Sequence, residues 1–123
     1  MGVSSSRVTS PRINSPHGKF IQQLIAENCV VVFSKTTCPY CTQAKDILRG
    51  MKVDHHVVEL NHHPEGSEIQ SVLAEMTNAR TVPRVFINGT CVGGASDVKS
   101  LYKTGKLIDL VNECNITASD VKQ

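Results

Sequence analysis

Residues 30–45 read V-V-V-F-S-K-T-T-C-P-Y-C-T-Q-A-K, and this stretch decides the fold. Its first four residues are apolar and mostly β-branched, which is typical of a buried strand. A short polar turn and two cysteines, Cys38 and Cys41, come next, and apolar residues at helical spacing follow. The stretch therefore predicts a buried strand that leads into a helix with a Cys-x-x-Cys in its first turn.

Cys38 is the candidate nucleophile of this stretch. The free N–H groups and the positive dipole end of a helix stabilise an anion, so a thiol at this position should ionise readily. Ready ionisation adds little to the rate of attack, because nucleophilicity falls as a thiol becomes more acidic, but it makes the thiolate a better leaving group. We therefore expect Cys38 to accept a group through a disulfide and to give it up again. Cys41, one turn further into the helix, can close a disulfide with Cys38.

A structural zinc site is the alternative interpretation of two cysteines at this spacing. Zinc takes four ligands, so such a site would need a second pair of Cys or His residues at ligand spacing. His55, His56, His62 and His63 form two pairs around a predicted strand at 54–60. They leave a metal site open, but solvated loop histidines are the simpler interpretation, and we expect no metal.

The composition argues against several classes of protein. The chain has 123 residues, a net charge of +2 and only five aromatic residues, which predicts one domain without a nucleic-acid surface. Five irregularly spaced cysteines with no preceding secretory segment favour a reducing compartment. The longest apolar run, residues 29–33, is far shorter than the ~20 residues of a membrane span. We expect a soluble protein without stable membrane insertion, cytoplasmic first and mitochondrial as the alternative.

Residues 1–15 are rich in Ser, contain Arg and have no acid. The expected interpretation is a disordered tail, and a weak transit peptide is the alternative. Gly2 also lies in an N-myristoylation pattern, although a single acyl chain would anchor the protein only marginally. The domain itself is expected at residues 16–116, with a C-terminal tail at 117–123.

The rest of the chain predicts alternating helices and strands. Apolar residues at helical or alternating spacing predict helices at 16–28, 39–49, 96–104 and 106–116, and strands at 29–34, 54–60, 84–87 and 90–92. A further helix is predicted to begin near Pro64 or Ser67 and to carry Ile69, Val72, Leu73 and Met76 on one face. Asn88-Gly89 between two apolar runs predicts a hairpin. With a right-handed crossover, this order gives a four-stranded mixed sheet flanked by about five helices. This α/β arrangement is the thioredoxin fold.

Three blocks resemble the signature of the dithiol glutaredoxins, in the same order and at similar separations. The blocks are Cys38-Pro39-Tyr40-Cys41, Thr81-Val82-Pro83 and Gly93-Gly94-x-x-Asp97. The resemblance covers about residues 18–115, and the flanking sequence is most similar to the animal mitochondrial/nuclear subgroup, the glutaredoxin 2 type. It implies a glutathione-dependent thiol–disulfide oxidoreductase with glutathione as co-substrate.

The resemblance also implies roles for residues outside the Cys-x-x-Cys. Val82, before a predicted cis proline, would pair with the cysteinyl part of glutathione, and Asp97 would take its ammonium group unless it serves only as a helix cap. Lys35 would take the glycyl carboxylate unless it is a plain solvated lysine. The implied glutathione-binding residues are Lys35, Tyr40, Gln70, Thr81, Val82, Pro83, Gly94, Ser96 and Asp97.

The resembled subgroup carries two further features. Cys29 and Cys114 can pair in a disulfide outside the active site, whereas Cys29 and Cys91 would otherwise be ordinary core residues. The subgroup commonly has Ser where this chain has Pro39, and the Ser form is associated with a [2Fe-2S] cluster that is held between two monomers and two glutathiones. Pro39 disfavours the cluster, so we expect a monomer.

The expected reaction is reduction of protein–glutathione mixed disulfides and of protein disulfides through the Cys38 thiolate, with Cys41 needed for the latter. A thioredoxin reduced by a flavoprotein is the rival enzyme, and the absence of Trp argues against it. An iron–sulfur carrier is the rival binding protein.

Overall fold

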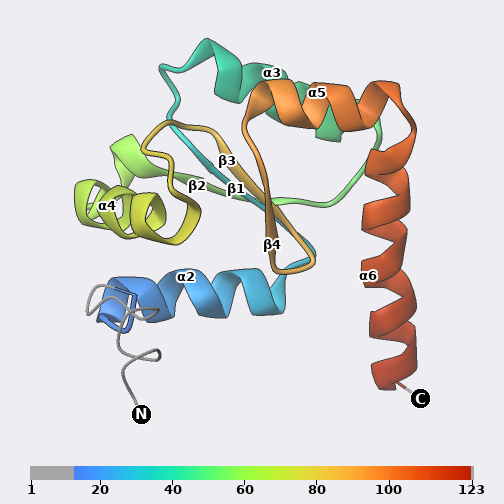
Figure 1. Ribbon diagram of the computed structural model, residues 1–123, viewed down its shortest axis with the longest axis horizontal. Coiled ribbons are helices and arrows are strands. Elements are labelled where there is room, and N and C mark those ends of the chain that lie inside the picture. The colour runs from blue at the N-terminus through green and yellow to red at the C-terminus, as the bar shows by residue number, and fades with distance from the viewer. Residues whose placement is uncertain (1–12, 123) are drawn as a thin grey trace.

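The computed structural model describes residues 13–122, with the side chains described as far as Cys114. One four-stranded sheet lies between helices on its two faces (Figure 1). The elements are α2 (Pro16–Glu27), β1 (Val30–Ser34), α3 (Pro39–Gly50), β2 (His56–Glu59), η1 (Leu60–His62), α4 (Gly66–Thr77), β3 (Arg84–Ile87), β4 (Thr90–Gly93), α5 (Ala95–Lys103) and α6 (Lys106–Lys122). The predicted order of elements and the mixed sheet of a thioredoxin fold are confirmed.

The sheet has the strand order β2-β1-β3-β4, so β1 is an inner strand between β2 and β3. β1 runs parallel to β2 and antiparallel to β3, so that Val32 pairs with Val57 on one side and with Val85 on the other. β3 and β4 form the predicted hairpin, and Asn88 (φ 53°) and Gly89 (φ 82°) supply the two left-handed residues that its tight turn requires.

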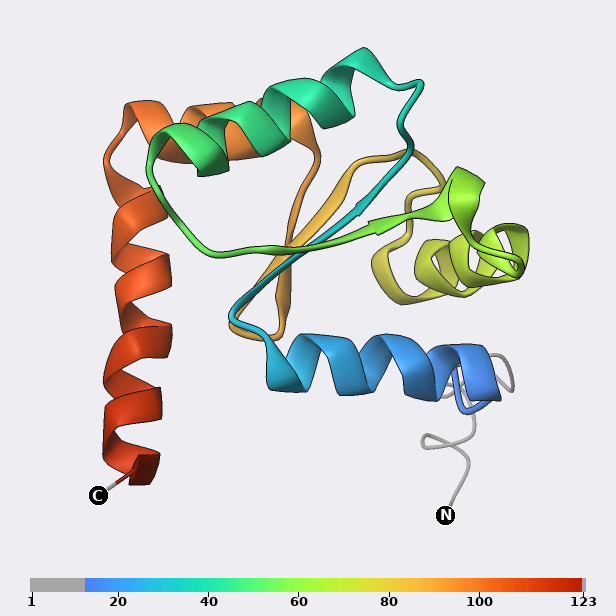
Figure 2. The same ribbon diagram turned by 180° about the vertical axis from the view of Figure 1, so that it is seen from behind.

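The two faces of the sheet bury separate cores. Figures 1 and 2 show α3 and α5 together on one face, α2 and α4 on the other, and α6 along one end. Because side chains alternate along a strand, Val30 and Val32 of β1 pack in the core beneath α3 and α5. Val31 and Phe33 pack in the core above α2 and α4. The same alternation places Ser34 on the α3 face of the sheet.

The segment after β1 and α3 differs from the sequence prediction at its ends. The expected strand at 54–60 is wrong in its bounds, because β2 ends at Glu59 and the buried Leu60 opens a 3-10 turn. α4 then begins at Gly66, where a Cβ atom would lie 1.8 Å from the Leu60 carbonyl oxygen. Only glycine fits so close to another backbone segment.

The chain ends were predicted to be tails. Ser15 caps α2 by accepting a hydrogen bond from the Gly18 N–H, as the Ser-Pro start predicted. Residues 1–12, including the acylation pattern, lie outside the described residues. At the other end α6 continues to Lys122, through most of the segment 117–123.

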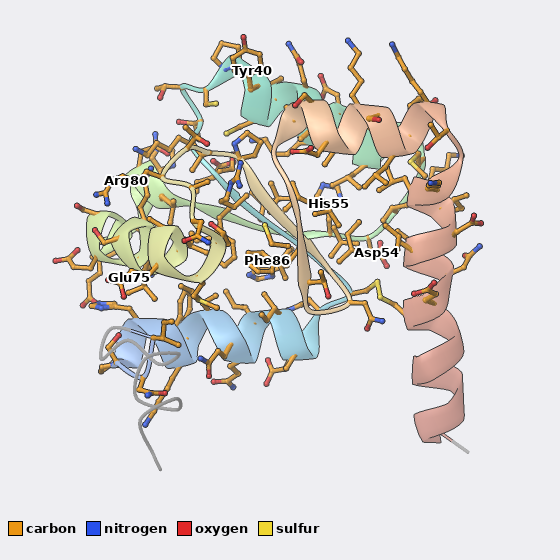
Figure 3. The ribbon with its side chains drawn as sticks, in the orientation of Figure 1. Tyr40, Asp54, His55, Glu75, Arg80 and Phe86 are labelled. Atoms are coloured by element: carbon orange, nitrogen blue, oxygen red, sulfur yellow. A yellow bond between two sulfur atoms is a disulfide. The ribbon has the colours of Figure 1, made fainter. Side chains whose placement is uncertain are left out.

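A disulfide joins Cys29, just before β1, to Cys114 in α6 (Figure 3). The two Cα atoms are 5.7 Å apart, and 85 residues separate the cysteines in the sequence. Cys91, expected as a core residue, is instead half-buried on β4 with a free thiol.

Candidate active site

Cys38 is the residue that caps the N-terminus of α3. Its Sγ atom accepts a hydrogen bond from the Cys41 N–H at 3.3 Å, so one of the unpaired N–H groups of the first turn points at the sulfur. Pro39 follows as the first helical residue, where a missing N–H has no cost. The sulfur therefore lies where the helix dipole favours negative charge, as the sequence predicted.

Cys41 has the opposite environment. Its side chain is fully buried, and its Sγ accepts a long hydrogen bond (3.5 Å) from the Lys35 N–H. Burial and then the contact with Cys38 raise the pKa of the Cys41 thiol from 9.0 to about 11, against smaller lowering effects of Lys35 and Ser34. Cys41 is thus a protonated, inaccessible thiol, whereas Cys38 is half-exposed.

The raised pKa predicts that the reduced protein loses stability in alkali. A thiol with a pKa of about 11 when folded and 9.0 when unfolded holds its proton more tightly in the folded state. Its stabilising effect is complete below about pH 9 and disappears as the pH rises through about 11, with a loss of up to ~3 kcal/mol for a shift of about two units. We expect the stability advantage of the reduced wild type over Cys41→Ala to shrink across this range in urea unfolding. A constant difference would contradict the prediction.

The loop before β3 approaches the Cys38 sulfur. The Val82–Pro83 peptide bond is cis, as predicted, and the Val82 carbonyl oxygen lies 3.7 Å from Cys38 Sγ and accepts its S–H. Arg84 folds back over this turn: its Nε donates to the Pro83 carbonyl oxygen at 3.1 Å, and its Nη2 donates to Thr81 Oγ1 at 3.5 Å. The guanidinium group therefore holds the turn that faces the sulfur.

The third block closes the other side of the site. Gly93 has φ 119°, a conformation that favours glycine, and a Cβ atom there would lie 2.1 Å from Asp97 Oδ2. The Asp97 carboxylate accepts a hydrogen bond of 2.9 Å from the Gly94 N–H at the start of α5. Asp97 is therefore a helix cap, and a ligand role would come in addition to that.

A groove of about 560 Å³ runs between the start of α3, the cis-proline loop and the start of α5. Its volume falls within the ~300–1,000 Å³ that is typical of small-molecule sites. Tyr40 lies at its outer rim, mostly exposed, near the start of α3 (Figure 3). The predicted binding residues that line the groove are Tyr40, Thr81, Val82, Pro83, Gly94, Ser96 and Asp97.

Two predicted binding residues lie outside the lining of this groove. Lys35 is half-buried in the loop before Cys38, and its carbonyl oxygen accepts the Cys38 N–H at 3.1 Å. The Gln70 side chain on α4 donates to the Arg80 carbonyl oxygen at 2.7 Å, so it holds the loop that leads to the cis proline. Figure 3 shows Arg80 on the α4 side of the molecule.

Sequence reasoning missed three polar residues of the groove. Gln43 and Lys99 line it together with Arg84. Helical spacing was an available signal for two of them, because Gln43 is three residues after Tyr40 and Lys99 three after Ser96. Arg84 carried no comparable signal, since its role depends on the shape of the turn.

Within residues 13–114, no group of three or more His, Cys, Asp or Glu side chains could hold a metal ion. The two histidine pairs are therefore not assembled into such a group. Between residues 13 and 122, none of the helices combines the length and the apolar character that a membrane span requires.

Comparisons with known proteins agree with this geometry. A family model described as Glutaredoxin matches residues 30–92. The chain is 47% identical to Glutaredoxin-2, mitochondrial of Bos taurus over 97% of its own length and 75% of that protein, and 50% identical to Glutaredoxin-2, mitochondrial of Homo sapiens over 84% and 63%. Among solved structures, a buckwheat glutaredoxin–glutathione complex superimposes with a TM-score of 0.81 at 36% identity, covering 87% of this chain and 96% of that one.

Proposed function

This chain belongs to the glutaredoxin family and is a glutathione-dependent thiol–disulfide oxidoreductase of the glutaredoxin 2 type; from that premise we propose that Cys38 is its nucleophile. One observation carries the assignment. Cys38 Sγ caps α3, contacts the Val82 carbonyl group and lies beside the groove, whereas the thiol of Cys41 is buried and protonated. Of the two thiols of the Cys-x-x-Cys, Cys38 is the one that is both accessible and placed to bear negative charge.

The proposed reaction with a glutathionylated protein uses Cys38 alone. Its thiolate attacks the glutathione sulfur of the mixed disulfide, the protein thiolate leaves and takes a proton, and glutathione stays bound to Cys38 through a new S–S bond. A second glutathione thiolate then attacks that glutathione sulfur and releases oxidised glutathione together with the Cys38 thiolate. The anion-stabilising helix terminus favours this departure.

We propose that protein disulfides require Cys41 as well. Cys38 attacks one sulfur of the substrate, and Cys41 then attacks Cys38 to release the reduced protein. The Cys41 N–H already touches Cys38 Sγ, so the two residues are adjacent before the reaction starts. Two glutathione molecules reduce the resulting Cys38–Cys41 disulfide.

The cysteinyl part of glutathione is proposed to pair with the backbone of Val82, as an added strand would. In the structure the Cys38 S–H donates a hydrogen bond to the Val82 carbonyl oxygen. A carbonyl oxygen has two lone pairs, so it can also accept the ligand's N–H. The nucleophile and the docked glutathione would then meet at one carbonyl group.

The two ends of glutathione are proposed to meet opposite ends of the site. The N–H groups of Ser96 and its neighbours at the start of α5 hold the γ-glutamyl carboxylate, and Asp97 takes the ammonium group. Lys35 takes the glycyl carboxylate. Gln70 uses one amide hydrogen on the Arg80 carbonyl group, and the second is proposed to reach the same carboxylate.

A coupled assay tests the proposed function directly. The full chain is mixed with glutathione, glutathione reductase, NADPH and the small mixed disulfide of glutathione and 2-mercaptoethanol, and NADPH oxidation is followed. We expect turnover that saturates with glutathione and depends on Cys38. A rate equal to that without the protein would contradict the proposal.

Asp97→Asn separates binding from helix capping. The amide oxygen of Asn can still accept the Gly94 N–H, so we expect little change in melting temperature. The lost charge removes the partner of the ligand's ammonium group and should raise the KM for glutathione ~10-fold, the effect of about 1.5 kcal/mol for a charged hydrogen bond. Steady-state kinetics at varied glutathione measure the change, and an unaltered KM would reduce Asp97 to a cap.

A [2Fe-2S] cluster between two monomers would take one thiolate from each chain and two from glutathione, so the half-exposed Cys38 thiol alone does not decide against a cluster carrier. Pro39 does count against it, because it is the first residue of α3 after Cys38, where the cluster-associated form of the resembled subgroup has Ser. We therefore propose glutathione as the co-substrate and a monomer as the working form. Gel filtration in glutathione should give a colourless monomer, and a brown dimer would contradict this.

The names of the Bos taurus and Homo sapiens relatives support the mitochondrial alternative of the sequence prediction. We propose the mitochondrion as the compartment, in place of the cytoplasm that the sequence favoured. Fractionation of cells that express the full chain with a C-terminal tag tests this, and recovery in the cytosol alone would contradict it.

A further inference from the structure

Two buried oxygen atoms near the resolving cysteine have no hydrogen-bond partner among the described residues. They are Ser34 Oγ and Glu59 Oε1. Ser34 is completely buried and lies against the Cys41 thiol, where it lowers the pKa of that thiol, but the contact falls outside hydrogen-bond geometry. Buried polar atoms are rarely left without a partner, so this pair invites a functional explanation.

The backbone places both oxygen atoms on the α3 face of the sheet. Ser34 and Glu59 are paired residues at the carboxyl ends of the parallel strands β1 and β2. Val32 and Val57, two residues earlier on each strand, pack in the core beneath α3, and side chains two residues apart share a face. Adjacent strands lie ~4.8 Å apart, so the two side chains are neighbours, and because neither oxygen atom has a direct partner, one water between them is the link that a relay requires.

α3 brings the cysteine and a counter-ion to this position. Cys41 and Lys45 are four residues apart and therefore lie on one face of the helix. Lys45 Nζ bonds Glu59 Oε2 at 2.7 Å, with side-chain exposures of 13% for Lys45 and 22% for Glu59. The ion pair fixes the carboxylate beneath the helix and leaves Oε1 as its uncommitted acceptor.

Cys41 needs an acceptor for its proton only when it attacks the mixed disulfide on Cys38 during reduction of a protein disulfide. A protonated, buried thiol cannot attack a disulfide until its proton has left, and no solvent contacts its side chain. We propose that Ser34 and Glu59 form a proton relay that activates Cys41 as the resolving thiol. The inference rests on the proposed function and concerns its second thiol.

As the Cys41 S–H bond breaks, its proton passes to Ser34 Oγ, and the serine's own proton passes through the bridging water to Glu59 Oε1. The electron pair left on Cys41 forms the S–S bond with Cys38, and the bond from Cys38 to the substrate sulfur breaks. The substrate leaves as a thiolate and takes a proton from solvent. When glutathione later reduces the disulfide, Cys41 leaves as a thiolate and recovers the proton from Glu59 by the same path.

Ser34 contacts the reacting sulfur, whereas Glu59 acts through Ser34 and is a positioning residue. The two thiols can be timed separately with 5,5′-dithiobis(2-nitrobenzoate) at one equivalent, in a Cys91→Ser background that removes the third free thiol. Attack by Cys38 releases one nitrothiolate in a bimolecular phase. Attack by Cys41 on the mixed disulfide releases the second in a phase that is independent of protein concentration.

We expect Ser34→Ala and Glu59→Gln each to slow the second phase at least ~10-fold. Direct acid–base catalysis typically contributes a factor of about 10²–10⁴ to a rate, and the expected effect is smaller because water can partly replace the relay. The first phase should not change. The double variant should be no slower than the slower single variant, because both residues serve one path. Glu68→Gln, which removes an exposed acid of α4, is the matched control and should leave both phases unchanged.

Three results would overturn the relay: an unaltered second phase in both variants, equal slowing of both phases, or equal slowing by Glu68→Gln. Ser34→Thr keeps the hydroxyl and should restore the second phase, which a packing defect would not explain. Failure of the proposed function has a different signature, because the first phase would then persist in Cys38→Ser.

Discussion

Replacing Cys38 with Ser should reduce turnover of a glutathionylated substrate at least ~10³-fold, a loss typical of removing a nucleophile. A hydroxyl group cannot form the disulfide that carries glutathione between the two half-reactions, so only the uncatalysed exchange remains. The fold should be intact, since Ser can cap α3 as Cys38 does. The coupled glutathione reductase assay measures the rate, and circular dichroism checks the fold.

Cys41→Ser is the matched control for this experiment. Because Cys41 is buried and protonated, we expect it to contribute nothing to deglutathionylation, so this variant should keep its rate within ~3-fold, a change in the activation free energy of less than ~1 kcal/mol. The rate of protein-disulfide reduction should instead fall in Cys41→Ser, because this variant has no second thiol to release the substrate from Cys38. Retained deglutathionylation in Cys38→Ser would overturn the mechanism, and its loss in Cys41→Ser would reassign the nucleophile.

Local pattern was enough to predict most of the fold. Asn88-Gly89 predicted the hairpin because a tight turn needs two left-handed residues, and the Ser15-Pro16 start predicted the first helix because it matches a cap and a first turn. The ends of β2 were not predicted correctly because they depend on a tertiary contact. Leu60 leaves the strand so that Gly66 can pack against its carbonyl group, and no periodicity carries that information.

The site divides in the same way. Residues in the three signature blocks were predicted because the blocks resemble the signature of the dithiol glutaredoxins, and that resemblance implies their roles. Arg84 was missed because its guanidinium group folds back and binds the turn that precedes it, a contact that depends on the shape of the turn. Ser34 and Glu59 were missed for a related reason: they meet across two strands, and their importance lies in hydrogen bonds that they do not make.

The buried polar group beneath α3 and the exposed groove beside it divide the chemistry between the two thiols. Cys38 needs solvent, a docked ligand and the helix terminus, all of which lie on the surface. Cys41 needs protection from direct attack and a route for one proton, which burial and a nearby carboxylate supply. One turn of helix therefore separates two environments whose properties are opposite, which is how a pair of identical residues acquires different roles.

In buffer without a reductant, Cys114→Ser should lower the free energy of unfolding by ~2–4 kcal/mol. This is the usual effect of removing a native disulfide. The Cys29–Cys114 bond closes a loop with a sequence separation of 85 residues. In the chain-entropy model such a loop is worth about 4.5 kcal/mol through its effect on the unfolded chain. Urea unfolding of the oxidised wild type and of the variant measures the difference.

Cys91→Ser is the control, because it removes a half-buried thiol that is in no disulfide and should change stability by less than ~1 kcal/mol. Treating the wild type with a reductant should bring its unfolding curve to that of Cys114→Ser, and coincident curves before reduction would contradict the pairing. Deglutathionylation should persist in Cys114→Ser, because the bond ties the start of β1 to α6 whereas Cys38 follows the other end of that strand. The disulfide thus acts on the stability of the domain and leaves the geometry of the active thiol to α3 and the cis-proline loop.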